Sequence, residues 1–204
     1  TLVQGEPTTL LSFVQLPFDH PLYILYSSGT TGAPKCIVHG AGGTLLQHLK
    51  ELVLHADLHT EDTLFYSTTT GWMMWNWMIS GLAVGATLVI YDGAPLYPNA
   101  DSLLRLVAEE GVTHFGTSAR YIAAIEKEGI GSKAKLSLPL LRTVLSTGSP
   151  LAPHSFDYIY REISPAVCLS SISGGTDIIS CFALGCPWKP VRRGEIQAIG
   201  LGMG

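Results

Sequence analysis

The chain has 204 residues, a length that suits one domain burying roughly 70% of its unfolded surface. Only 14% of the residues are charged and the net charge is −4, so composition gives no electrostatic reason to expect nucleic acid or an anionic membrane as a partner. The longest apolar run, residues 81–91, is too short to cross a bilayer and is interrupted by glycines, so no membrane span is predicted.

Strand-like and helical patterns alternate along residues 21–204, after an irregular lead-in over residues 1–20. The predicted strands cover residues 22–25, 36–39, 64–66, 87–91, 112–115, 143–145, 166–169 and 195–199. The predicted helices cover residues 42–56, 101–110 with Asp101 as its cap, 118–129 with Thr117 or Ser118 as its cap, and 152–163. This alternation predicts an α/β fold with a mostly parallel sheet flanked by helices.

The cysteines and histidines show no metal-binding pattern. The four cysteines are scattered among apolar neighbours, at Cys36, Cys168, Cys181 and Cys186. Reduced core thiols are favoured over disulfides or zinc, because Cys181 and Cys186 lack a second close pair. His55 and His59 lie where a helix is ending and are interpreted as surface residues. Reduced thiols, and first residues without a signal-peptide pattern, predict a cytoplasmic protein.

A polar loop, Tyr-Ser-Ser-Gly-Thr-Thr-Gly-Ala-Pro-Lys over residues 26–35, follows the first predicted strand. That strand is read as buried, so the loop is expected at the carboxyl edge of a sheet, where α/β proteins bind ligands. Hydroxyls and the N–H groups of glycine can surround phosphate oxygens, and a lysine adds positive charge. The predicted polyphosphate site consists of Ser27, Ser28, Gly29, Thr30, Thr31, Gly32 and Lys35.

Two other interpretations of this loop are less favoured. A Walker loop needs four residues between its glycines and Lys-Ser/Thr at its end, whereas here two threonines separate the glycines and Cys36 follows the lysine. Pro34 also argues against a helix beginning where a Walker loop would begin one. An ordinary surface turn rarely combines these residues behind an apolar strand.

Two more polar loops follow predicted strands. Residues 146–150, Ser-Thr-Gly-Ser-Pro, come after the strand at 143–145, and residues 171–177, Ser-Ile-Ser-Gly-Gly-Thr-Asp, come after the strand at 166–169. Glycines and small polar groups suit places where backbone passes close to a ligand. Both loops are therefore expected to supply further ligands to the nucleotide.

In this order the three loops resemble the signature segments of the adenylate-forming enzymes, the acyl-CoA synthetase and luciferase superfamily. The resemblance implies that Lys35, Thr176 and Asp177 are catalytic, with Thr176 bonding phosphate and Asp177 holding Mg²⁺. One carboxylate is chemically sufficient, because Mg²⁺ takes one or two carboxylates beside phosphate oxygens. The further ATP- or AMP-binding residues that it implies are Gly148, Ser149, Pro150, Ser173, Gly174, Gly175 and Thr176.

Residues 71–77, Gly-Trp-Met-Met-Trp-Asn-Trp, lie where the superfamily places its acyl-binding segment. Tryptophan and methionine are also good core residues, and Trp77 and Met78 are expected to be core. Because a strand end and a polar turn at 68–70 precede this segment, Trp72, Met73 and Met74 are predicted to form the wall of an acyl pocket, and the resemblance adds Gly174 to that wall.

The sequence departs from the superfamily pattern at three positions. Ser173 stands where an aromatic residue stacks on adenine, and Asp177 replaces a glutamate, which shortens the reach to metal by one methylene. Gly174 stands where acetyl-CoA synthetases have a tryptophan that closes the acyl pocket. The expected substrate is therefore an acid somewhat larger than acetate, and not a long-chain fatty acid.

The combined motifs, over residues 21–204, resemble those of the acetoacetyl-CoA synthetases. The resemblance implies that a short acid, acetoacetate, is activated with ATP to an acyl-adenylate and then to its CoA thioester, with release of AMP and pyrophosphate. ATP, Mg²⁺ and coenzyme A are the implied cofactors and substrates. The chain lacks an initial methionine and the superfamily's hinge aspartate and lysine-bearing C-terminal domain, so a partial N-terminal domain that is not fully active alone is expected.

The sequence suggests three alternatives. Another short- or medium-chain acyl-CoA synthetase differs only in its acid, and a nucleotide-binding module without activity would lack the lysine-bearing domain altogether. An α/β-hydrolase is the third, because residues 39–43, His-Gly-Ala-Gly-Gly, are similar to a lipase oxyanion loop. It is rejected because no Gly-x-Ser-x-Gly motif occurs in the chain.

Overall fold

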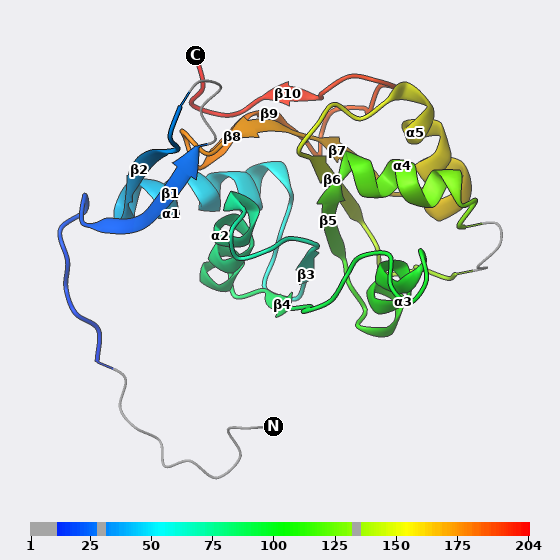
Figure 1. Cartoon of the computed structure of the whole chain (residues 1–204), viewed down its shortest axis with the longest axis horizontal. Coiled ribbons are helices and arrows are strands. Elements are labelled where there is room, and N and C mark those ends of the chain that lie inside the picture. The colour runs from blue at the N-terminus through cyan, green and yellow to red at the C-terminus, as the bar shows by residue number, and fades with distance from the viewer. Residues whose placement is uncertain (1–11, 28–31, 132–135) are drawn as a thin grey trace, which may run out of the picture.

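The computed structural model describes residues 12–27, 32–131 and 136–204. Its centre is a five-stranded parallel sheet with the strand order β4-β3-β5-β6-β7 (Figure 1). The strands are β3 (Thr63–Tyr66), β4 (Thr87–Val89), β5 (His114–Ser118), β6 (Thr143–Thr147) and β7 (Cys168–Ser171). The predicted α/β fold with a mostly parallel sheet is confirmed.

Helices cover both faces of this sheet (Figure 1). One face carries α1 (Ala41–Leu49), its π-helical continuation η1 (Lys50–His55), α2 (Met73–Ile79) and the short 3₁₀ helix η2 (Ser80–Ala83). The other carries α3 (Ser102–Glu109), α4 (Ala119–Lys127), α5 (Pro153–Tyr158) and its π-helical continuation η3 (Ile159–Ile163). None of the helices in the described ranges is long and apolar enough to cross a membrane.

The two faces bury separate apolar clusters, as alternation along a strand requires. In β3, Phe65 packs against α3 and α4, whereas Leu64 and Tyr66 pack on the side of α1 and α2. Val144 and Leu145 divide in the same way in β6. The strands β3, β5 and β6 are buried on both faces, which explains why their sequences do not alternate between apolar and charged residues.

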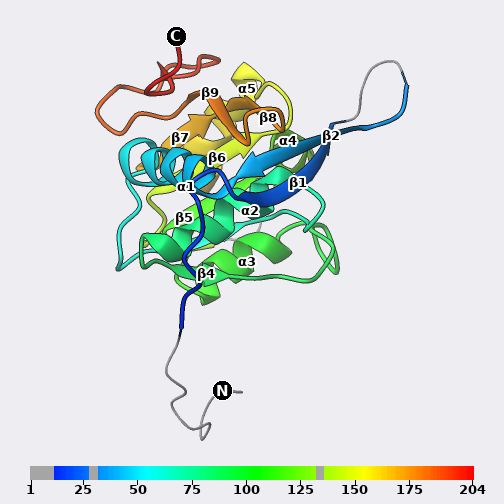
Figure 2. The same cartoon turned by 90° about the vertical axis from the view of Figure 1, so that its left-hand side faces the viewer.

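Two small antiparallel sheets lie beside the central sheet. One has the order β10-β9-β8 and consists of β8 (Ser173–Gly175), β9 (Ser180–Leu184) and β10 (Ala198–Ile199). The other is a hairpin of β1 (Pro21–Ser27) and β2 (Lys35–Gly40), which projects from the body of the molecule (Figure 2). Neither β8 nor β9 was predicted from the sequence.

The hairpin corrects the prediction of a buried first strand. Ile24 is 58% exposed and Tyr26 67% exposed, while only Tyr23 and Leu25 pack against the core. The strand pairs with β2 alone and is no part of the parallel sheet. An apolar run of four residues was therefore insufficient evidence of burial on both faces.

Three smaller expectations, on Asp101, Cys36 and His55, were wrong, and others were confirmed. Asp101 occupies the N-cap position of α3, but its carboxylate makes no capping hydrogen bond and instead accepts from Arg105 at 2.8 Å. Cys36 is exposed and is not a core thiol, although all four cysteines are free as predicted. His55 is buried, whereas His59 is exposed as expected. Ser118 does cap α4, accepting from the Tyr121 N–H at 3.1 Å.

Candidate functional site

A cavity of about 490 Å³ lies at the carboxyl edge of the parallel sheet. Segments that are far apart in the sequence meet there: the loop after β6, the strand β8 that follows β7, the start of α2, and β9. Among the lining residues are Trp72, Met73, Met74, Gly148, Ser149, Pro150, Ser173, Gly174, Gly175 and Thr176. The described residues that sequence reasoning assigned to adenosine and to the acyl group thus share one cavity.

Hydrogen bonds fix the loop after β6 against the strand that follows β7. The Ile172 N–H donates to the Ser146 carbonyl at 2.8 Å, and the Thr147 hydroxyl donates to the Ile172 carbonyl at 3.0 Å. Gly148 then turns the chain with a φ of +88°, a conformation that favours glycine. A β-carbon at Gly148 would lie 3.7 Å from the indole of Trp72, so the position of a side chain here faces that ring.

The aromatic segment serves both the cavity and the core. Trp72 is half-buried, and Met73 and Met74 are buried; all three line the cavity. Trp77 and Met78 are buried in the apolar cluster, as expected. The Tyr66 ring lies edge-to-face with two of the three tryptophans of this segment, at 6.0 Å from Trp72 and 6.1 Å from Trp77, which fixes the wall of the cavity to β3.

Gly174 lines the cavity, but packing gives it a second role. A β-carbon at this position would lie 3.0 Å from the Cys181 α-carbon and closer still to the Ser180 carbonyl oxygen, both in the backbone of β9. The lack of a side chain therefore permits β8 and β9 to approach each other. Room for the acyl group is not the only physical reason for a glycine here.

The described residues of the predicted polyphosphate loop lie at or beside the end of the β1–β2 hairpin. Ser28, Gly29, Thr30 and Thr31 lie outside the described residues. Ser27 pairs with Lys35 at the last described step of the ladder, and Lys35 is exposed. Ser27, Gly32 and Lys35 are not among the residues lining the cavity. Ser27 and Lys35 therefore belong to the hairpin and not to the edge of the parallel sheet (Figure 2).

Thr176 and Asp177 follow β8. Thr176 lines the cavity, and its carbonyl accepts a hydrogen bond from His39 Nε2 at 2.9 Å, which connects β2 to this turn. Asp177 is exposed. No group of three or more candidate metal ligands occurs in the described ranges. An exposed single carboxylate fits Mg²⁺ bound mainly by phosphate oxygens and water, and not a cage of protein ligands.

Sequence reasoning missed a set of buried polar residues beside the cavity. Gln47, His48 and Glu51 on α1 and η1 form hydrogen bonds to residues 179–181, more than 120 positions away. The only sequence feature that could have indicated them is the spacing of polar residues within an otherwise apolar helix. Polar residues on one side of a helix normally indicate a face exposed to solvent, so this feature favoured exposure and not burial.

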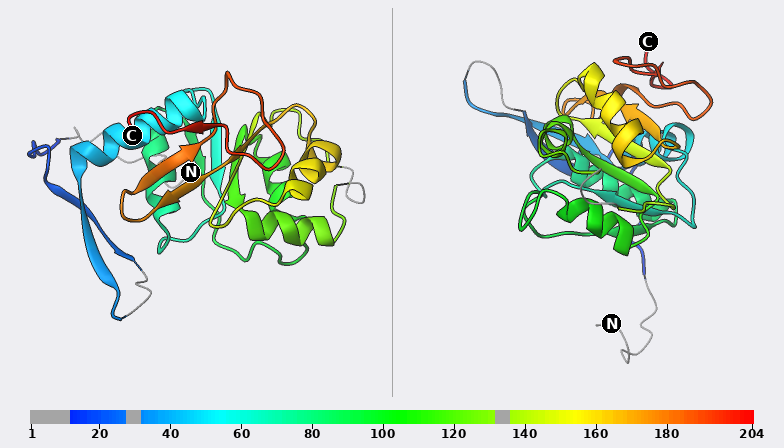
Figure 3. Two further views of the ribbon diagram at one scale, coloured as in Figure 1. Left: turned by 90° about the horizontal axis from the view of Figure 1, so that it is seen from above. Right: turned by 90° about the vertical axis from the view of Figure 1, so that its right-hand side faces the viewer.

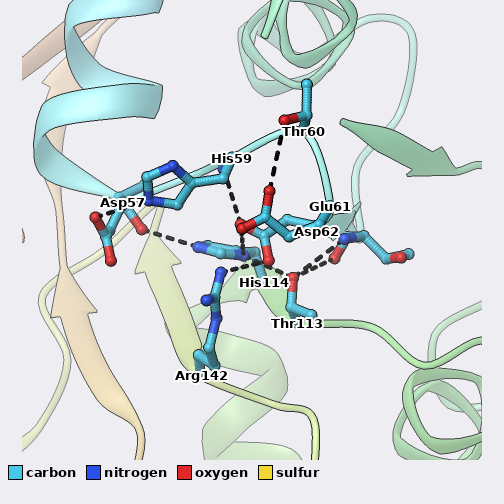
Figure 4. Close-up of polar contacts among 10 residues, drawn as sticks. Asp57, His59, Thr60, Glu61, Asp62, Thr113, His114 and Arg142 are labelled. Atoms are coloured by element: carbon cyan, nitrogen blue, oxygen red, sulfur yellow. Dashed lines mark hydrogen bonds and ion pairs between the residues drawn. The ribbon is translucent and has the colours of Figure 1, made fainter. Parts of the chain in front are cut away.

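A second polar cluster lies at the amino ends of the strands, opposite the cavity (Figure 4). The Asp62 carboxylate is buried, accepts from the His59 N–H at 2.8 Å and pairs with Arg142, which precedes β6. His114 in β5 donates from Nε2 to the Ala56 carbonyl at 2.9 Å, and burial lowers its pKa. This cluster ties β3, β5 and β6 together, and its residues Asp62, His114 and Arg142 do not line the cavity.

Known proteins are similar to this chain in sequence, and a solved structure is similar to it in fold. An acetoacetyl-coenzyme A synthetase of Rhizobium meliloti is 60% identical over 201 residues, which are 98% of this chain and 31% of that protein. A malonamoyl-CoA synthetase of Penicillium aethiopicum is 51% identical over 216 residues, covering 99% of this chain and 30% of that protein. The solved acetoacetyl-CoA synthetase from Streptomyces lividans superposes with a TM-score of 0.88 at 49% identity, over 93% of this chain and 30% of that chain.

The chain thus spans about a third of the length of the relatives it matches. Residues 7–197 match the family described as AMP-binding enzyme, which is most of the chain. The sequence match and the fold agree with each other, and the chain belongs to the AMP-binding enzyme family.

Proposed function

We propose that this chain carries nucleotide- and acyl-binding residues of an enzyme that activates acetoacetate with ATP and transfers it to coenzyme A. The observation that carries the proposal is the cavity, in which the predicted adenosine loop, the strand β8 and the acyl segment meet. The acetoacetyl-CoA synthetase relatives support the choice of acid. Because they are about three times as long, the complete reaction is a property of the longer protein.

The proposed chemistry has two steps. An oxygen of the substrate carboxylate attacks the α-phosphorus of ATP, and pyrophosphate leaves with the electron pair of the broken P–O bond. The thiol of coenzyme A, losing its proton, then attacks the acyl carbon, and AMP leaves. Reactions of this kind depend mainly on holding the reactants in line and on compensating the phosphate charge.

The residues of this chain would bind and orient the nucleotide. Ser27, Gly32 and Lys35 would contact the β- and γ-phosphates, and Thr176 would donate a hydrogen bond to phosphate. Asp177 would hold Mg²⁺, which when bound supplies positive charge to the phosphate oxygens. Gly148 and its two successors would border the adenosine. With Ser173 in place of an aromatic residue, adenine would pack on Ile172, which lines the same cavity.

The acyl group would lie against Trp72, Met73 and Met74. A cavity of about 490 Å³ that also receives adenosine has space for a short acid and not for a fatty-acid chain. A second candidate is malonamate, because one relative is a malonamoyl-CoA synthetase. Acetoacetate and malonamate share a carboxylate and a β-carbonyl, and differ only by a methyl or an amino group on that carbonyl.

The test is ATP–pyrophosphate exchange catalysed by the full-length gene product. Acetate, acetoacetate, malonamate, butyrate and a long-chain fatty acid are compared at equal concentration. The fastest exchange with acetoacetate is expected. The fastest exchange with malonamate would keep the chemistry and replace the acid, and no exchange with any of the five would refute adenylation of a short acid.

A further inference from the structure

The turn that follows β8 is held by a polar row on α1 and η1, consisting of Gln47, His48 and Glu51. This helix runs beside β9 (Figure 3). His48 and Glu51 are fully buried, and Gln47 is half-buried. Burying a polar side chain destabilises the fold unless the side chain is hydrogen-bonded, so the hydrogen-bond partners of the row indicate which segment it holds.

Glu51 is a carboxylate with donors on each oxygen. Oε1 accepts from the Cys181 N–H at 2.9 Å, from the Gln47 amide at 3.2 Å and from the Ser180 hydroxyl. Oε2 accepts from the Trp77 indole N–H at 2.8 Å. Two of these donors are in β9, where Ser180 and Cys181 line the cavity. The carboxylate thus connects the helix, the acyl segment and the first residues of β9.

His48 holds the residue before β9. Its Nε2 lies 2.7 Å from the Ile179 carbonyl oxygen and its Nδ1 lies 2.8 Å from the Ser80 hydroxyl. A carbonyl oxygen can only accept, so Nε2 carries a proton and donates to it; in the neutral imidazole Nδ1 then accepts from the Ser80 hydroxyl, whose oxygen also lies 3.2 Å from the Asn76 carbonyl. Burial lowers the pKa of His48, which favours this neutral form near pH 7.

Ile179 has a φ of +47°, in the left-handed region that a β-branched residue rarely adopts. Its side chain is buried, and its N–H closes a turn onto the Thr176 carbonyl at 3.2 Å. Such strain persists only where surrounding contacts over-determine the conformation, and it is concentrated at functional sites. His48 on one side and the turn to Thr176 on the other are the contacts that do so here.

We propose that Gln47, His48 and Glu51 are positioning residues, which hold residues 179–181 so that Thr176 and Asp177 are presented at the rim of the cavity. This inference rests on the proposed function, in which those two residues meet phosphate and Mg²⁺. An apolar helix face would serve stability equally well. The polar row additionally fixes the position of residues 179–181, since each hydrogen bond holds one atom of that segment.

The experiment measures the gain in ATP affinity on adding Mg²⁺, by calorimetry on the full-length gene product. His48→Leu is expected to reduce this gain by about fivefold or more, because the metal-binding turn moves. His48→Gln keeps an N–H within reach of the Ile179 carbonyl and should stay within about twofold of the native gain. Ile125→Val, a buried change in α4 on the opposite face, is the matched control and should leave the gain unchanged.

Asp177→Ala is the reference for complete loss of the gain. Adding His48→Leu to Asp177→Ala should cause no further loss, since both act through one turn. If His48→Leu does not fold, Gln47→Leu replaces it, which removes one donor to Glu51 and Ser180.

One outcome would overturn the positioning role alone: the gain in ATP affinity on adding Mg²⁺ is lost in Asp177→Ala but stays native in His48→Leu, or in Gln47→Leu where that variant replaces it. A native protein without any Mg²⁺-dependent gain, or an undiminished gain in Asp177→Ala, would refute the proposed metal role and the positioning role with it.

Discussion

Replacing Gly174 by alanine tests whether packing or pocket volume requires this glycine. The added β-carbon would lie 3.0 Å from the Cys181 α-carbon and 3.1 Å from the Ser180 carbonyl carbon. Carbon atoms in van der Waals contact are about 3.5–4.0 Å apart, so β9 must move by about 0.5–1 Å. Forced overpacking of this kind costs about 1–3 kcal/mol. For 150–250 residues, that loss of unfolding free energy lowers Tm by about 2–12 °C.

The neighbouring glycine is a matched control. A β-carbon at Gly175 would find its nearest neighbour, the Asp177 Oδ2, at 3.7 Å, which is ordinary contact. Thermal unfolding of Gly174→Ala and Gly175→Ala should therefore differ clearly, with Gly175→Ala close to the native Tm. ATP–pyrophosphate exchange by the full-length gene product carrying the same substitutions should fall in Gly174→Ala for every acid tested. Equal Tm values for the two variants, or a loss confined to larger acids, would show that the packing argument is wrong.

Two further predictions concern the metal and the pH. Asp177→Ala should raise the Mg²⁺ concentration needed for ATP–pyrophosphate exchange and lower the maximal rate by orders of magnitude; near-native rates at every Mg²⁺ concentration would place the metal elsewhere. Burial lowers the pKa of His48 and of His114 from the ordinary value of 6.5. Below pH 6.5 the unfolded chain therefore binds protons that the folded chain does not, and unfolding free energy should fall by up to about 1.4 kcal/mol per pH unit for each histidine. Urea unfolding at pH 7.5 and 5.5 measures this, and an unchanged slope in His114→Gln would contradict the assignment for that residue.

The parallel sheet was predictable because its strands are short apolar runs separated by helical patterns. Strands such as β5 and β6 are buried on both faces and, apart from His114, consist of apolar or small residues. Loops after such strands must lie at one edge, which is why the adenosine loop and β8 were expected to share a site. The cavity at that edge agrees with this reasoning.

The hairpin and the polar row could not be predicted in this way. In β1 the same kind of apolar run is exposed on one side, because hairpin pairing leaves Ile24 and Tyr26 without a covering layer in the described residues. Glu51 is buried, and two of its four hydrogen-bond donors are Ser180 and Cys181, about 130 positions away. Local periodicity contains no information on such distant partners, so a charged residue in a helix is assigned to solvent by default.

Gly174 shows why a sequence difference and a specificity determinant must be distinguished. Compared with acetyl-CoA synthetases, which have a tryptophan at the matching position, a glycine at 174 indicates a larger acyl pocket. In the structure, however, any side chain there meets the backbone of β9 before it meets an acyl group. A tryptophan at this position would displace Ser180 and Cys181, so loss of acetoacetate activity would not identify the pocket. The choice of acid is better tested at Met73 and Met74, which line the cavity from α2, because exchanging one methionine for leucine changes the cavity's shape while nearly conserving side-chain volume.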